Sequence, residues 1–127
     1  MKDVIIKPFN AVIFGGDGDL SKRKIIPAFY HRYVDGQLKM PFRIICITRK
    51  LDDEAAFKTL LTEFISNTLE EGEELREIDG FLEHLELMKI PSTDKASFEV
   101  LKNAIGLDPN WQRVFYFSVP SSAFAEI

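Results

Sequence analysis

Three glycines near the N-terminus, Gly15, Gly16 and Gly18, form a pattern that could hold a phosphate group. They follow an apolar run, residues 11–14, and precede three consecutive cations at positions 22–24. This order predicts a buried strand, a tight turn and the start of a helix. Backbone N–H groups in the first turn of a helix lack intrahelical partners and lie at the positive end of the helix dipole. The predicted chemistry is therefore capture of a phosphorylated ligand, with a purely structural turn as the alternative.

The turn reads GxxGDL, the spacing of a shortened dinucleotide-binding turn, and the Walker pattern GxxxxGK[ST] is absent. Glycine supplies a positive φ and lets the backbone approach a pyrophosphate closely. The carboxylate of Asp17 would oppose a bound phosphate unless it points away or is neutralised by Lys22 or Lys24. Asp19, at the start of the helix, is predicted to be a helix cap rather than a catalytic acid.

The second predicted strand, residues 43–48, ends on cations where NAD-binding domains of this kind place an acidic residue. Arg49 and Lys50 follow the strand, and the first carboxylate is Asp52. A guanidinium can grip a 2′-phosphate and stack on adenine. Arg49 therefore predicts NADP rather than NAD as the ligand, with an ordinary surface arginine as the alternative.

Alternating strand and helix patterns would position these residues. Strands are predicted over residues 11–14, 43–48, 85–90 and 114–119, the first, second and fourth of them covered on both faces. Helices are predicted over residues 19–34, 53–69 and 94–105. The acidic residues 70–77 are predicted to form a solvated helix or a loop. The first helix should kink at Pro27, and Gly36 and Gly106 should end the first and third helices. The order βαβαβαβ predicts an α/β fold, a Rossmann-like parallel sheet with helices on both faces.

Composition narrows the class of protein. The 127 residues suit one domain, and a net charge of −4 argues against nucleic-acid or anionic-membrane binding. No stretch has the length of a membrane span and no signal peptide is recognised, so the chain is expected to be cytoplasmic. The lone Cys46 lies in an apolar run and is predicted to be a buried, inert thiol. His31 and His84 are predicted to be structural rather than catalytic, and no metal site is predicted.

Several motifs together resemble those of the glucose-6-phosphate dehydrogenase family. They are the pattern GDLxxRKxxP from Gly18 to Pro27, Thr48-Arg49 after the second strand, Gly36-Gln37-Leu38, and Tyr116-Phe117-Ser118-Val119-Pro120 followed by Phe124. The resemblance extends over nearly the whole chain, from residue 12 to residue 127. The family commonly has Ser, Thr or Ala at position 17 and two prolines in the loop after the fourth strand, whereas this chain has Asp17 and a single Pro120.

The resemblance implies roles for individual residues. The turn would hold the pyrophosphate of NADP, chiefly through the backbone of Gly15, Gly18 and Leu20, with Gly16, Asp17 and Asp19 in the same turn. Arg49, with Lys50, would bind the 2′-phosphate. Lys24 would lie near both the coenzyme and the sugar phosphate. Val119 and Pro120 would pack beside the nicotinamide half of the coenzyme.

The resemblance also implies what the parent enzyme does. It would oxidise glucose 6-phosphate to 6-phosphogluconolactone and produce NADPH in the pentose phosphate pathway, as a homo-oligomer. Residues 1–127 are expected to be the N-terminal part of its NADP-binding domain, without the substrate and dimer domain. The family's EKPxG motif and its RIDHYLGK stretch with the catalytic histidine do not occur in the sequence, so no catalytic residue is predicted here. The alternative is a stand-alone dinucleotide-binding module without activity.

Overall fold

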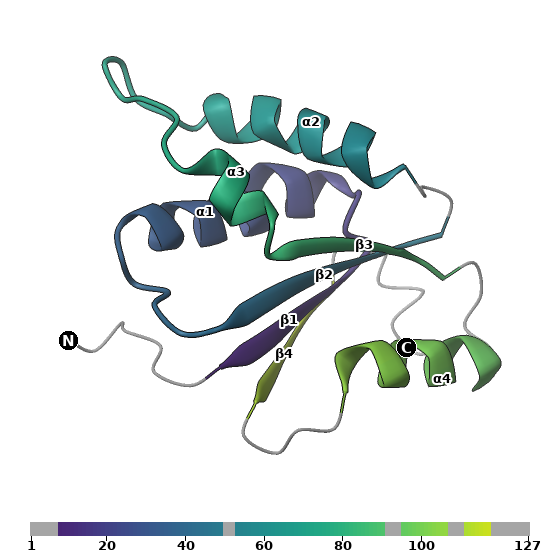
Figure 1. The fold of residues 1–127 in the computed structure, drawn as a ribbon. Helices are drawn as coiled ribbons and strands as arrows, with labels where there is room; N and C mark the ends of the chain where they lie inside the picture. Colours follow the sequence, from purple (N-terminus) through teal and green to yellow (C-terminus); the bar gives the residue numbers. More distant parts are fainter. Residues whose placement is uncertain (1–7, 50–52, 91–94, 107–110, 118–127) are drawn as a thin grey trace.

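A computed structural model of the chain describes residues 8–49, 53–90, 95–106 and 111–117. These residues form a parallel sheet with strand order β3-β2-β1-β4. The strands are β1 (Phe9–Phe14), β2 (Phe42–Thr48), β3 (Leu85–Lys89) and β4 (Gln112–Phe117). Helices α1 (Ile26–Val34), α2 (Glu54–Ser66) and α3 (Ile78–Leu82) cover one face, and α4 (Lys95–Ile105) covers the other (Figure 1). The predicted Rossmann-like sheet with helices on both faces is confirmed.

The sheet has a packed core on each face. Every residue of β1 is buried, as the continuous apolar run predicts for a central parallel strand. Alternate residues of β1 point to opposite faces, so Ala11 and Ile13 join the core under α1, α2 and α3, while Val12 and Phe14 join the core under α4. The glycine turn is therefore attached to the most firmly packed strand of the sheet.

Strand β4 differs from its prediction. Its apolar sequence predicts a strand covered on both faces, but Val114 is 37% exposed and Phe115 is 46% exposed. The prediction was wrong because β4 pairs with β1 on one side and lies at the edge of the sheet that the described residues form. Apolar residues show that a strand tends to be buried, but they do not show which helices or strands will cover it.

The first helix carries an irregularity directly before Pro27. Residues 19 and 20 are helical, Ser21–Ile25 form a π-helical turn (η1), and α1 continues from Ile26. The Ile26 N–H donates to the carbonyl of Ser21, five residues earlier, and Pro27 follows with no N–H to donate. A kink was predicted at Pro27, and the structure shows a π-helical turn directly before it, which was not predicted. Gly36, at φ 77°, ends the helix as predicted.

Helix α2 begins and ends close to its predicted bounds. Asp53 caps it, since its side chain accepts a hydrogen bond from the Ala56 N–H at 3.0 Å. The acidic residues 70–77 form no helix and run through turns, so the loop alternative is confirmed. Tyr30 fastens their end: its hydroxyl donates to the Arg76 carbonyl at 2.7 Å and accepts from the Arg76 N–H at 2.9 Å. The short helix α3, which the sequence analysis missed, follows.

Helix α4 ends at Gly106, whose φ is 81° and whose N–H donates to the Lys102 carbonyl at 3.1 Å, as predicted for a left-handed end residue. Leu101 is buried against the sheet and anchors the helix to the core formed with Val12 and Ile45.

Candidate functional site

The predicted phosphate turn and Arg49 lie at the same edge of the sheet. Strands β1 and β2 are parallel neighbours, and Phe14, the last residue of β1, pairs in register with Ile47 of β2. The turn after β1 therefore begins level with the end of β2. Because β2 and β4 flank β1 on opposite sides, this edge also contains the point where the strand order reverses, which is where open α/β sheets bind ligands.

Two hydrogen bonds tie the glycine turn to β2. The N–H groups of Gly15 and Gly16 both donate to the Ile47 carbonyl, at 3.0 and 2.9 Å. Gly15 has a φ of 72°, a conformation that side chains with a Cβ rarely adopt. The Gly18 N–H then donates to the Gly15 carbonyl at 2.8 Å and closes the turn. Since the N–H groups of Gly15, Gly16 and Gly18 are used inside the protein, they serve to shape the turn.

Gly16 is buried because the turn passes directly over β2. A Cβ at position 16 would lie 2.5 Å from the Cβ and 2.8 Å from the Cα of Cys46, distances at which atoms cannot coexist. Cys46 itself is fully buried, and this burial, together with the negative charges of Asp17 and Glu54, raises the pKa of its thiol. The prediction of a buried, inert thiol is confirmed. Its role is to form the floor under the turn.

The helix start offers the backbone N–H groups that a phosphate needs. The first α-helical bond runs from the Lys22 N–H to the Gly18 carbonyl at 3.1 Å, so the N–H groups of Asp19 and Leu20 precede it and have no acceptor one turn earlier. Asp19 lies inside this first turn, and Gly18 is the residue before it. The prediction that Asp19 caps the helix was therefore wrong. Its exposed carboxylate lies 3.5 Å from Nε of Arg23, one turn along.

The three cations after the turn diverge. The Lys22 ammonium and the Arg23 guanidinium each lie 5.2 Å from the ring centroid of Phe64 on α2. Phe57, Leu61 and Phe64 form one apolar stripe along α2, and the contact of Phe64 with the two cations was not predicted. Phe57 and Leu61 are fully buried while Phe64 is half-buried, so the stripe is wider than the core it covers. The sequence did place Phe64 on this face of the helix, because it lies three positions after Leu61 and seven positions after Phe57.

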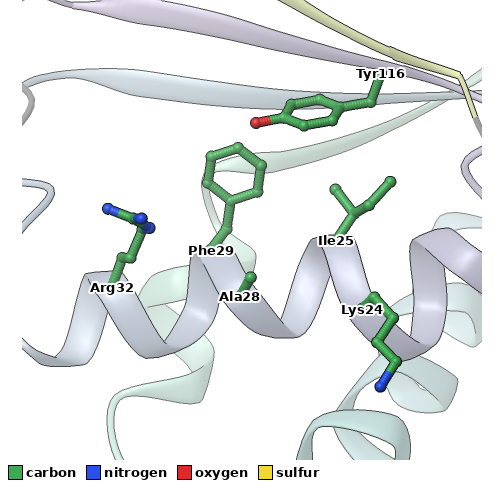
Figure 2. Close-up of a pocket in the computed structure, with 6 residues that line it drawn as sticks. All are labelled: Lys24, Ile25, Ala28, Phe29, Arg32 and Tyr116. Atoms are coloured by element: carbon green, nitrogen blue, oxygen red, sulfur yellow. The ribbon is translucent and has the colours of Figure 1, made fainter. Parts of the chain in front are cut away.

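Lys24 contacts a different part of the surface from Lys22 and Arg23. It lines a pocket of about 280 Å³ together with Ile25, Ala28, Phe29, Arg32 and Tyr116. Figure 2 shows Tyr116 of β4 above Phe29, and the Lys24 ammonium pointing away from Tyr116. The ring centroids of Phe29 and Tyr116 are 5.8 Å apart in an edge-to-face arrangement. The pocket floor is therefore apolar, and Lys24 is an exposed cation at its rim.

Arg49 is exposed and directly follows β2. Its position agrees with the predicted arrangement of turn and guanidinium at one edge of the sheet. Lys50, Val119 and Pro120, the other predicted coenzyme residues, lie outside the described residues.

The two histidines lie away from this edge, in structural contacts, as predicted. His31 Nε2 and the Thr68 hydroxyl are 2.8 Å apart, which joins α1 to the end of α2. His84 stacks on Phe42 with ring centroids 4.0 Å apart, and its Nδ1 lies 3.0 Å from the Phe42 carbonyl. The described residues contain no group of three His, Cys, Asp or Glu side chains arranged to hold a metal ion. Among the same residues, no helix combines the length and the hydropathy that a membrane span requires.

The parallel sheet, the glycine turn after its first strand and the helix start beyond that turn define a Rossmann-like, dinucleotide-binding type of domain. Residues 12–127 match the family described as glucose-6-phosphate dehydrogenase, NAD binding domain. The chain belongs to this family, and the resemblance noted in the sequence is confirmed. The family's description supports a nicotinamide dinucleotide as the coenzyme of the domain.

Individual relatives agree with this assignment. The chain is 30% identical over 123 residues to glucose-6-phosphate 1-dehydrogenase of Rhizobium meliloti, covering 96% of this chain and 25% of that protein. It is 34% identical over 119 residues to the Leuconostoc mesenteroides enzyme, covering 90% and 24%. A crystal structure of the Mycobacterium avium enzyme superposes with a TM-score of 0.80 at 25% identity, covering 96% and 26%. The chain thus spans about a quarter of the length of the relatives it matches.

Proposed function

We propose that residues 1–127 are the coenzyme-binding segment of an NADP-dependent glucose-6-phosphate dehydrogenase. The observation that carries the NADP assignment is Arg49, an exposed guanidinium directly after β2 and level with the glycine turn. In dinucleotide-binding sheets the end of the second strand meets the adenosine ribose. A planar guanidinium there suits a 2′-phosphate, which it can bind through two parallel hydrogen bonds.

The turn fits the pyrophosphate of such a coenzyme. Gly16 lets the turn pack flat against Cys46, because a side chain at that position would collide with β2. The N–H groups of Asp19 and Leu20, at the positive end of the helix, would donate to the phosphate oxygens. When bound, the nicotinamide supplies the acceptor for a hydride from C1 of the sugar. The residues of this chain bind and orient the coenzyme.

The substrate side of the proposal rests on the family. The parent enzyme would oxidise glucose 6-phosphate to the lactone, with a histidine outside this chain as the general base. Lys24 would lie near the coenzyme and the sugar phosphate, and Lys50, Val119 and Pro120 would complete the coenzyme site. We also propose that the parent enzyme is a homo-oligomer and is cytoplasmic.

The test is coenzyme titration of the full-length protein and of an Arg49→Ala variant. We expect Arg49→Ala to weaken NADP binding by about two orders of magnitude and NAD binding by less than about threefold, since a charge-assisted bidentate contact is lost for one ligand alone. Arg76→Ala is the matched control, because the Arg76 side chain is exposed and its contacts with Tyr30 are made by the backbone.

An unchanged NADP-to-NAD preference in Arg49→Ala would refute the assignment of the 2′-phosphate site. The alternative, a stand-alone dinucleotide-binding module, predicts coenzyme binding without any oxidation of glucose 6-phosphate by the full-length protein, so an activity assay separates the two functions.

A further inference from the structure

Strand β3 lies at one end of the sheet that the described residues form, with β2 as its neighbouring strand. The N–H of Ile90, directly after β3, donates to the Thr48 carbonyl of β2 at 2.7 Å. Because successive N–H groups of a strand point to opposite sides, the even-numbered residues of β3 face β2 and the odd-numbered ones face outward. Such an outward row of backbone groups is a template on which a further strand can add.

The side chain of Glu54, in the first turn of α2, reaches this outward row. Its Oε2 accepts a hydrogen bond from the Leu87 N–H, the central outward donor of β3, at 3.1 Å. Its Oε1 lies 3.1 Å from the ammonium of Lys58, one turn further along α2. The ion pair therefore holds the carboxylate in place while its other oxygen occupies the strand edge.

The remaining outward positions of β3 leave little room for pairing. Leu85 is 1% exposed, so its N–H lies out of reach of another chain. The strand ends at Lys89, an exposed cation of the kind that discourages pairing at sheet edges. Leu87 is therefore the first position at which an added strand could form a backbone hydrogen bond.

Open space lies close to the Glu54 carboxylate. A groove of about 370 Å³ runs between α2 and α3, and its walls include Lys58 of α2 and Leu82 of α3. Lys58 belongs both to this groove and to the ion pair with Glu54. Within the described part of the chain, no other strand pairs with the outer side of β3. A single side chain thus occupies the accessible donor of this edge.

We propose that the Glu54 carboxylate closes the β3 edge against strand addition by a second copy of this chain. The carboxylate uses the Leu87 N–H that an added strand needs, and it places negative charge where that strand would present a carbonyl oxygen. A second copy is the partner because two β3 strands can pair across a two-fold axis, which gives a self-complementary contact. The inference concerns the β3 edge and is independent of the proposed coenzyme-binding function.

The test is the concentration at which the full-length protein associates beyond its natural oligomeric state, measured by sedimentation. Glu54→Ala removes the acceptor, whereas Glu54→Gln keeps an oxygen at the same reach. We expect Glu54→Ala to associate at about tenfold lower concentration and Glu54→Gln to behave like the natural sequence. Glu63→Ala, an exposed carboxylate further along the same helix, is the matched control and should change nothing. Thermal melting of each variant establishes that it is folded.

An unchanged association of folded Glu54→Ala overturns the inference. An equal increase in Glu54→Ala and Glu54→Gln also overturns it, because loss of the charge rather than loss of the acceptor would then govern association. Hydrogen exchange of the natural full-length protein needs no variant. The bond to Glu54 should slow exchange of the Leu87 N–H at least about tenfold relative to the unfolded chain, and exchange at the unfolded rate would overturn the inference.

Discussion

The two outer strands of the sheet, β3 and β4, differ in how completely other parts of this chain cover them. At the β3 edge, Glu54 of α2 accepts a hydrogen bond from the Leu87 N–H at 3.1 Å, and Leu85 is buried. At the β4 edge, Val114 and Phe115 are exposed. Strand β3 is thus the better covered of the two, with Leu85 buried, residues 86–88 half-buried and Lys89 exposed. The glycine turn is held from the same half of the sheet by the contacts of Gly15 and Gly16 with β2, while β4 contributes Tyr116 to the wall of the Lys24 pocket.

The largest effect should come from adding a Cβ under the glycine turn. Gly16→Ala places that atom 2.5 Å from the Cβ of Cys46 in the best-packed part of the sheet, so the turn or β2 must move. We expect a loss of about 3 kcal/mol in the free energy of unfolding, measured by urea denaturation, together with loss of dinucleotide binding.

Gly72→Ala is the matched control for this change. Gly72 has a φ of 87° and no atom within 4 Å of an added Cβ, so its substitution costs backbone strain alone, about 1 kcal/mol. Equal losses in the two variants would show that the contact with Cys46 does not hold the turn.

A smaller effect should distinguish β1 from β4. Val12 is fully buried in β1, whereas Val114 of β4 is 37% exposed. We expect Val12→Ala to lower the free energy of unfolding of the 127-residue chain by about 2 kcal/mol, and Val114→Ala by less than about 1 kcal/mol. Urea denaturation measures both. A Val114→Ala loss as large as that of Val12→Ala would mean that β4 is covered in solution.

The smallest effect concerns pH and the Glu54 carboxylate, which contacts β3. Burial acts to raise the pKa of Glu54, but the hydrogen bond from the Leu87 N–H and the Lys58 ammonium at 3.1 Å outweigh it, and the pKa is lowered from its usual 4.5. A group whose pKa is lowered by folding stabilises the protein above its usual pKa and loses that contribution as the pH falls through the lowered value.

We therefore expect Glu54→Gln to be less stable than the natural sequence by under about 1 kcal/mol at neutral pH, because solvent screens a carboxylate this exposed. The difference should shrink as the pH falls below 4.5. Thermal melting across this range measures it, with Glu63→Gln on the exposed side of the same helix as the matched control. A difference that grows at low pH would contradict the assigned direction.

Most of the fold followed from local patterns, and the misses arose where longer-range contacts or backbone hydrogen bonds decided the structure. The strands were located to within two residues at their starts because continuous Ile, Val and Phe runs suit buried parallel strands. The π-helical turn was missed, although Pro27 marked its place. The exposure of Val114 and the contacts of Phe64 were missed because each depends on a neighbour distant in the sequence. Asp19 was misplaced by one residue, since helix starts are fixed by hydrogen bonds that composition does not show.

By itself the sequence determined the parallel α/β class, the glycine turn, the exposed arginine after the second strand and the family, because these depend on residue type and short spacing. The tertiary structure decided which groups the turn offers to a ligand. Gly16 packs on Cys46, and the N–H groups of Gly15 and Gly16 donate to the Ile47 carbonyl, so these two N–H groups are used inside the protein. The ring of Phe64 on α2 holds the cationic groups of Lys22 and Arg23. Such choices follow from three-dimensional proximity, which no spacing along one chain encodes.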